Sequence, residues 1–255
     1  MAKKLIENGI HVLVEKPLAA TVAEAQELAD LAAEKNVVGA VGYVERCNPA
    51  ISALRQKIEE GLLGEIYQIA TVRQSPFPAR INDVGVVKDL ATHDLDLTAW
   101  VADSPYASVS ASTKHSSGRE HEDFVTVSGQ LNNGVIVNHL VNWMSPYKER
   151  KTVVTGENGA LVAETVLSDL TYYKNGVDRI EWDQISNFRG VSEGEVTRYA
   201  INKPEPLAVE HRNFREAILN GTPSIATFAD GLRTMRVVEA VLESAKSNSV
   251  VNVED

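Results

Sequence analysis

The chain has 255 residues, of which 44% are hydrophobic, and its formal net charge is -10 at pH 7. This length and apolar fraction can build a large core, in one domain or in two. The negative charge argues against binding to nucleic acid or to an anionic membrane, because both require an excess of Lys and Arg. Cys47 is the only cysteine, and no apolar run has transmembrane length. We therefore expect a cytoplasmic protein without an intrachain disulfide.

The N-terminal part of the chain alternates between helix and strand. A short helix is expected over residues 2–8, followed by an apolar strand over 10–14. Thr21 begins a Thr-Val-Ala-Glu capping-box sequence that opens the next helix, and a second apolar strand follows over 37–41. Because a helix separates the two strands, we expect the strands to be parallel.

The pattern changes after residue 65, where apolar and polar residues alternate as in half-buried strands. A helix over 88–101 interrupts these strands, and helices over 207–220 and 228–247 end the chain. The charged, glycine-bearing stretch 175–206 is interpreted as a long and partly irregular connection. The expected strands cover residues 65–73, 123–131, 135–143, 151–155, 160–165 and 170–174.

These patterns predict an α/β unit followed by an α+β unit. Residues 1–45 would form a Rossmann-like parallel sheet remnant, the C-terminal part of a dinucleotide-binding domain. Residues 46–255 would form a substrate-binding and dimerisation domain. Its large, mainly antiparallel mixed sheet would carry helices on one face, and the C-terminal helices could pack back on the first domain.

Glu15, Lys16 and Pro17 follow directly after the first apolar strand. Pro17 can neither donate to a strand ladder nor continue a helix interior, so the strand should end here. The C-terminal ends of strands are where α/β sheets place their ligands. We therefore expect the glutamate and the lysine to lie at a ligand site.

The predicted helix over 88–101 carries Asp89 and His93 four residues apart, and Asp96 follows one turn later. Residues at this spacing share one face of an α-helix. A carboxylate one turn from an imidazole would orient the ring and favour its protonated form. This arrangement suits a general base that removes a hydroxyl proton. The alternative interpretation is an ordinary acid at the start of a helix beside a partly buried histidine.

Three motifs occur in order along the chain: Glu15-Lys16-Pro17, Gly42-Tyr43-x-x-Arg46-x-Asn48-Pro49 and Asp89-x-x-x-His93-x-x-Asp96. The chain thereby resembles the glucose–fructose oxidoreductase, inositol dehydrogenase and MocA family. The resemblance implies an NAD- or NADP-dependent enzyme that oxidises a secondary hydroxyl of a sugar. It implies that Lys16 polarises the hydroxyl, that His93 acts as acid and base, and that Asp89 orients the site. It also implies that Glu15, Lys16 and Pro17 lie beside the nicotinamide ribose.

Segments 44–50, 75–80 and 142–150 carry a narrower resemblance, to family members that act on nucleotide-linked N-acetyl sugars. A diphosphate needs local cations, and the guanidinium of Arg matches phosphate oxygens in geometry. The alternative for each cation is a solvated charge at a strand end. The expected substrate-binding residues are Arg73, Arg80, Asp96, Lys148 and Arg150.

The sequence contains no Gly-x-Gly-x-x-Gly turn, which holds the pyrophosphate in Rossmann domains. We therefore expect weak binding of NAD or NADP by this chain alone, whether the short N-terminus is natural or a misplaced start. An alternative function is a non-catalytic fragment that binds a sugar nucleotide or dimerises. A homodimer or homotetramer through the open sheet face is expected. No metal site is expected, because His115 and His121 lack a nearby third ligand.

Overall fold

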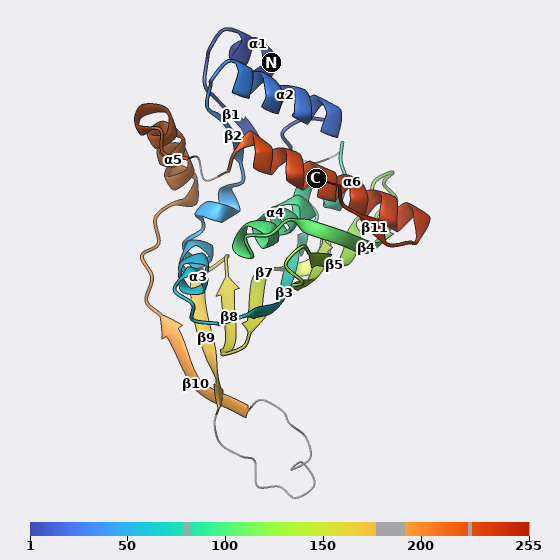
Figure 1. The fold of residues 1–255 in the computed structure, drawn as a ribbon. Coiled ribbons are helices and arrows are strands. Elements are labelled where there is room, and N and C mark those ends of the chain that lie inside the picture. The colour runs from blue at the N-terminus through green and yellow to red at the C-terminus, as the bar shows by residue number, and fades with distance from the viewer. Residues whose placement is uncertain (79–80, 82, 177–191, 224–225, 255) are drawn as a thin grey trace, which may run out of the picture.

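The computed structural model describes residues 1–78, 81, 83–176, 192–223 and 226–254 (Figure 1). The N-terminal unit, drawn in blue, consists of α1 (Ala2–Glu7), β1 (Val12–Glu15), α2 (Val22–Glu34) and β2 (Gly39–Gly42). Its two strands are parallel, as predicted, and each begins slightly later than the apolar pattern suggests. Thr21 accepts a hydrogen bond from the backbone N–H of Glu24, which completes the predicted capping box.

The second unit is built on a nine-stranded sheet with the order β10-β9-β8-β7-β3-β6-β5-β4-β11. Among the strands of this sheet that the structure describes, β3 and β6 pair in parallel and the other neighbours are antiparallel. The predicted mainly antiparallel mixed sheet is thereby confirmed. Its strands are β3 (Ile66–Pro76), β4 (Tyr106–Lys114), β5 (Phe124–Leu131), β6 (Ile136–Asn142), β7 (Met144–Gly156), β8 (Gly159–Glu164), β9 (Asp169–Gly176), β10 (Ser192–Tyr199) and β11 (Val251–Asn252).

Three strands do not follow from the apolar pattern, and these are β4, β10 and β11. The expectation of an irregular connection over 175–206 is wrong for residues 192–199, which form β10 and pair with β9 at the edge of the sheet. Strand β10 reads Ser-Glu-Gly-Glu-Val-Thr-Arg-Tyr, so it offers few apolar residues to a search for alternation. Its strand conformation depends on pairing with β9, which sequence periodicity does not report.

One face of the nine-stranded sheet is covered by helices, and the other face is open. Along β6, Val137 and Val141 are buried beneath the helices, whereas Ile136 and Leu140 on the opposite face are 53% and 43% exposed. This is the period-two alternation of a half-buried strand, and it confirms the predicted helices on one face. The covering helices are α3 (Pro49–Glu59), α4 (Thr92–Val101) and α6 (Phe228–Ser247).

Helix α6 contacts both units. Its first turns pack with Ile6, Leu18 and Val41 of the N-terminal unit, and its later turns join the core beneath the large sheet. Gly231 permits this approach, because a Cβ there would lie 2.7 Å from Val41 Cγ2. Helix α5 (Pro206–Asn220) precedes α6 and ends, as predicted, before Gly221. Within the described part of the chain, no helix is both long enough and apolar enough to cross a membrane.

Candidate active site

Lys16 lies just after β1 and contacts Asp89, which is distant in the sequence. Lys16 Nζ donates hydrogen bonds to Asp89 Oδ1 at 2.7 Å and to the Asp89 carbonyl oxygen at 2.5 Å. The two side chains are 15% and 18% exposed, so the ion pair is largely shielded from solvent. The contact fixes the ammonium between the end of β1 and the start of the mid-chain helix.

Asp89 lies in a π turn, η2 (Val87–Ala91), that leads into α4. The expected contact between Asp89 and His93 is not formed. The Asp89 carboxylate bonds to Lys16, and Nδ1 of His93 is buried without a hydrogen-bond partner among the described residues. A π turn closes its hydrogen bonds over five residues, which changes the angle between Asp89 and the following helix. The spacing along the sequence predicted a contact between Asp89 and His93, whereas Asp89 bonds to Lys16 in the structure.

His93 is held in its neutral form by its surroundings. Burial is the largest effect that lowers the pKa of His93 well below its usual range, and the charges of Arg73, Lys16 and Arg150 lower it further. The charge of Glu45 acts in the opposite direction. The carboxylate that favours the protonated imidazole is thus Glu45, whereas the spacing along the sequence had suggested Asp89. Because the Lys16 charge acts on His93, the two predicted catalytic side chains belong to one electrostatic site.

A buried ionic cluster lies beside His93. Glu45 Oε1 accepts hydrogen bonds from Arg73 Nη1 at 2.9 Å and from Arg150 Nη1 at 2.8 Å. Arg73 Nε donates to Asp94 Oδ2 at 2.9 Å. Burial alone would raise the pKa of Glu45, but Arg73, with contributions from His93 and Arg150, lowers it to about 2. Glu45 is thus a carboxylate at neutral pH, on the 3₁₀ turn η1 (Val44–Cys47) that follows β2.

Two cations reach toward solvent from β7, namely Lys148 and Arg150. The Arg150 side chain is 32% exposed and shares the single oxygen Glu45 Oε1 with Arg73. Lys148 forms no ion pair within the described residues, and the charge of Arg150 is the main cause that lowers its pKa. The carboxylates of Glu45 and Glu164 are the negative charges that act on both cations. Arg80, the remaining predicted cation, lies outside the described residues.

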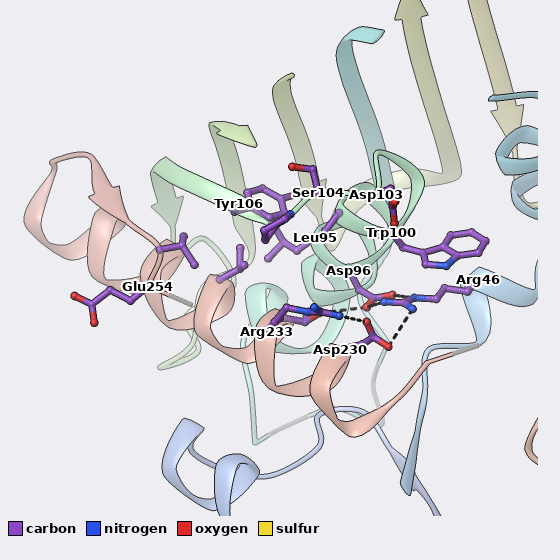
Figure 2. Close-up of a pocket in the computed structure, with 15 residues that line it drawn as sticks. Arg46, Leu95, Asp96, Trp100, Asp103, Ser104, Tyr106, Asp230, Arg233 and Glu254 are labelled. Atoms are coloured by element: carbon purple, nitrogen blue, oxygen red, sulfur yellow. Dashed lines mark hydrogen bonds and ion pairs between the residues drawn. The ribbon is translucent and has the colours of Figure 1, made fainter. Parts of the chain in front are cut away.

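Asp96 does not join this cluster. Its carboxylate accepts from Arg46 Nε at 2.8 Å and from Arg46 Nη2 at 2.6 Å, and Thr234 Oγ1 lies 3.2 Å away. Arg46 also lies 3.6 Å from Asp230 of α6. Arg46, Asp96 and Asp230 line a cavity between α4 and α6 (Figure 2), and its volume is about 150 Å³. Asp96, predicted to bind substrate, thus forms a buried ion pair that connects η1 with α4.

Glu45 and Asp94 are the two site residues that sequence reasoning missed. One signal was present in the alternation of β3, where Ile69, Thr71 and Arg73 all point to the buried face. A guanidinium on the buried face of a strand requires buried carboxylates nearby. The sequence therefore indicates that Arg73 needs carboxylate partners, but it does not indicate which carboxylates these are.

Comparisons with known proteins give the family. Residues 1–43 match the oxidoreductase family with an NAD-binding Rossmann fold, and residues 51–162 match the GFO/IDH/MocA C-terminal domain. The chain belongs to the GFO/IDH/MocA family. The resemblance expected from the sequence motifs is confirmed, and with it membership of an oxidoreductase family that has an NAD-binding domain and whose members include sugar dehydrogenases.

Several GFO/IDH/MocA relatives match nearly the whole chain. UDP-N-acetylglucosamine 3-dehydrogenase of Acidithiobacillus ferrooxidans is 28% identical over 95% of this chain and 72% of its own length. The scyllo-inositol 2-dehydrogenase (NAD(+)) of Bacillus subtilis is 24% identical over 100% of this chain and 74% of its own. A solved structure of the Acidithiobacillus enzyme superposes with a TM-score of 0.83 at 26% identity, covering 96% of this chain and 74% of that one.

The fold is also found in levoglucosan dehydrogenase. Its complex with NADH and levoglucosan superposes with a TM-score of 0.84 at 23% identity, covering 100% of this chain and 77% of that one. At this identity the likeness concerns the fold alone. It supports the confirmed fold class, a small parallel sheet followed by a large mixed sheet with helices on one face.

Proposed function

We propose that this protein oxidises a secondary hydroxyl of a nucleotide-linked N-acetyl sugar, with Lys16 and His93 as catalytic residues. The observation that carries the proposal is that the Lys16 ammonium and the neutral His93 imidazole share one electrostatic site. Lys16 donates a hydrogen bond to the substrate oxygen and stabilises the negative charge that develops there. The O–H bond breaks, and its proton passes to the unprotonated imidazole of His93.

The residues at the end of β1 fit the reacting end of a nicotinamide nucleotide, NAD or NADP. Glu15, Lys16 and Pro17 would hold this end, where the parallel strands finish. Gly42, the partner of Glu15 in the strand pair, leaves room for that carboxylate, because a Cβ at residue 42 would lie 3.1 Å from Glu15 Oε2. When bound, the nucleotide supplies the oxidant for the carbon that bears the hydroxyl.

Asp89 keeps the orienting role implied by the resemblance, and we propose that it orients Lys16. Through its carbonyl and carboxylate oxygens, Asp89 fixes the Lys16 ammonium and so positions it for the substrate hydroxyl. A lysine side chain is long and flexible, and two acceptors remove much of that freedom before substrate binds. Asp89 is therefore proposed as the positioning residue for Lys16.

The substrate class is proposed from two cations of β7, Arg150 and Lys148, of which Lys148 forms no ion pair among the described residues. A diphosphate would give both side chains phosphate oxygens to bind, and one guanidinium can bind two such oxygens at once. The name of the Acidithiobacillus relative, UDP-N-acetylglucosamine 3-dehydrogenase, supports the same class. Asp96 is left out of the substrate site, because its carboxylate is already bound by Arg46.

The deciding experiment compares the oxidation of UDP-N-acetylglucosamine, N-acetylglucosamine and scyllo-inositol at saturating NAD or NADP. We expect turnover of the nucleotide sugar, and a KM raised about tenfold or more in Arg150→Gln, because one charge-assisted contact is lost. Arg198→Gln is the matched control, since the Arg198 side chain is 68% exposed and pairs with Asp169 on the distant strand β9. Equal turnover of the free sugar, unaffected by Arg150→Gln, would reject the nucleotide-sugar assignment. Binding without turnover would instead support the non-catalytic fragment.

We also propose that the open sheet face forms a homodimer or homotetramer interface in a cytoplasmic protein. Ile136, Leu140, Tyr173 and Val196 are each more than a third exposed on this face, and no described helix covers them. Leu140→Asp should lower the mass measured by light scattering. Leu219→Asp is the control, because Leu219 is exposed on α5 and lies outside the sheet. A monomeric mass for the unaltered protein would refute the interface.

A further inference from the structure

Two buried polar atoms of the candidate site lack a partner among the described residues, and these are Glu45 Oε2 and His93 Nδ1. Unpaired polar atoms are costly inside a protein, so their presence in one site calls for an explanation. Glu45 uses only Oε1 in its contacts with Arg73 and Arg150. Oε2 of the buried Glu45 carboxylate therefore has no partner among the described residues, in a site that also contains the cations Lys16, Arg73 and Arg150.

The charges around His93 explain what this oxygen can do. Lys16 lies at the end of β1, Arg73 on β3 and Arg150 on β7, and all three oppose a positive imidazole. Asp89 is engaged by Lys16, and Asp94 is engaged by the Nε of Arg73.

Glu45, on η1, is the acidic group that most strongly favours the protonated imidazole. The influence is mutual, since the charge of His93 lowers the pKa of Glu45.

We propose that Glu45 is a positioning residue for His93, whose carboxylate compensates the positive charge that forms when the imidazole takes a proton. The inference rests on the proposed function, because only a site that moves a proton needs this compensation. Glu45 is anchored by two guanidinium groups, so its charge is fixed in place before the reaction begins. Without it, His93 would have to become positive among three cations in a buried site.

The test is the titration of the His93 imidazole by NMR, which requires neither cofactor nor substrate. Arg150→Gln serves as the background, because losing one opposing cation should raise the pKa of His93. Adding Glu45→Gln to this background should lower that pKa again, and Glu45→Asp should retain most of the rise. A pKa of His93 that is the same with Arg150→Gln alone and with Glu45→Gln added would overturn the proposal. The proposal would also be overturned if the His93 imidazole stayed neutral, with Arg150→Gln alone and with Glu45→Gln added, at every pH at which the two proteins remain folded.

The matched control is Asp94→Asn in the same background. Asp94 and Glu45 both bind the Arg73 guanidinium, so either substitution loosens that side chain. Only the Glu45 substitution should lower the pKa of His93 strongly. Equal shifts would mean that the effect comes from packing around Arg73, and the proposal would fail.

A parallel assay separates this inference from the proposed function. In an active enzyme, Glu45→Gln should move the acid limb of the kcat/KM profile to lower pH and lower the maximum rate. Absence of sugar oxidation in the unaltered protein, with the NMR shifts as expected, would reject the function and leave the charge coupling standing. Sugar oxidation with an unmoved acid limb in Glu45→Gln would reject the coupling alone.

Discussion

The ammonium of Lys16 and the carboxylate of Asp89 lie 2.7 Å apart although 73 positions separate them in the sequence. The contact joins the end of β1 to the π turn η2, and it connects the N-terminal unit with the helix that carries His93. Lys16 directly follows a strand and His93 lies in the first turn of α4, so both catalytic candidates lie next to regular elements that limit their positions.

Replacing Lys16 by Met should reduce kcat by about 100-fold or more, since groups that stabilise charge at the reacting oxygen contribute this much. The side chain retains its length but loses the ammonium. Steady-state kinetics with saturating sugar nucleotide would measure the loss. Lys57→Met is the control, because Lys57 pairs with Glu60 on the surface of α3 and should leave kcat unchanged. A wild-type kcat in Lys16→Met would contradict the catalytic role of Lys16.

Replacing His93 by Leu should abolish turnover and yet raise the free energy of unfolding by about 1 kcal/mol. The gain arises because His93 Nδ1 is buried without a partner in the described structure, and an unsatisfied buried polar atom costs about 1–3 kcal/mol. Chemical denaturation measures the stability, and single-turnover assays measure the chemistry. Lower stability in the variant would mean that the imidazole makes a contact essential to the fold.

Replacing Asp96 by Asn should destabilise the fold by about 3–5 kcal/mol, the usual effect of breaking a buried ion pair. Asp96 and Arg46 are 1% and 5% exposed, so the guanidinium would lose its main counter-charge beside the cavity in Figure 2. Glu59→Gln breaks the exposed Arg55–Glu59 pair and should cost at most about 0.5 kcal/mol. A small change in the free energy of unfolding of Asp96→Asn, together with a raised KM, would support the original prediction that Asp96 binds substrate.

Replacing His139 by Leu should destabilise the protein at neutral pH and reduce its acid sensitivity. His139 bonds to Thr71 Oγ1 and to Tyr106 Oη, both at 2.8 Å, and losing a buried partner costs about 1–3 kcal/mol. Burial lowers the pKa of His139 from 6.5 to about 3. The native protein therefore loses stability as the pH falls through this window, because the unfolded chain binds the extra proton, at about 1.4 kcal/mol per pH unit.

The difference in stability between the native protein and His139→Leu should accordingly shrink as the pH falls from 6.5 and change sign before pH 3, because a loss of about 1.4 kcal/mol per pH unit over this window exceeds the initial difference of about 1–3 kcal/mol. Urea unfolding at a series of pH values would measure this gap. Protonation of His93 and of the carboxylates also changes stability with pH. These contributions are common to both proteins and cancel in the comparison. A gap that stays constant with pH would show that His139 is protonated equally in the folded and unfolded states.

Much of the fold could be read from local patterns. The capping box at Thr21, the helix over 228–247 and the hairpin around Asn132 depend on neighbours in sequence, and the structure contains them all. Strand β10 escaped prediction, because its polar sequence adopts a strand only beside β9. The π turn at Asp89 was not predicted either, because the spacing of residues over 88–101 does not distinguish a π turn from a regular α-helix.

The candidate site divides in a similar way. The sequence alone determined which side chains to consider, because Lys16 follows a strand and His93 lies four residues after Asp89 in a predicted helix, regardless of how these elements pack. Tertiary structure alone decided the pairing: Asp89 with Lys16, Asp96 with Arg46, and Glu45 with two arginines. The reason is that the energy of a charge inside a protein depends on burial and on partners from other elements, and neither is encoded in spacing along the chain.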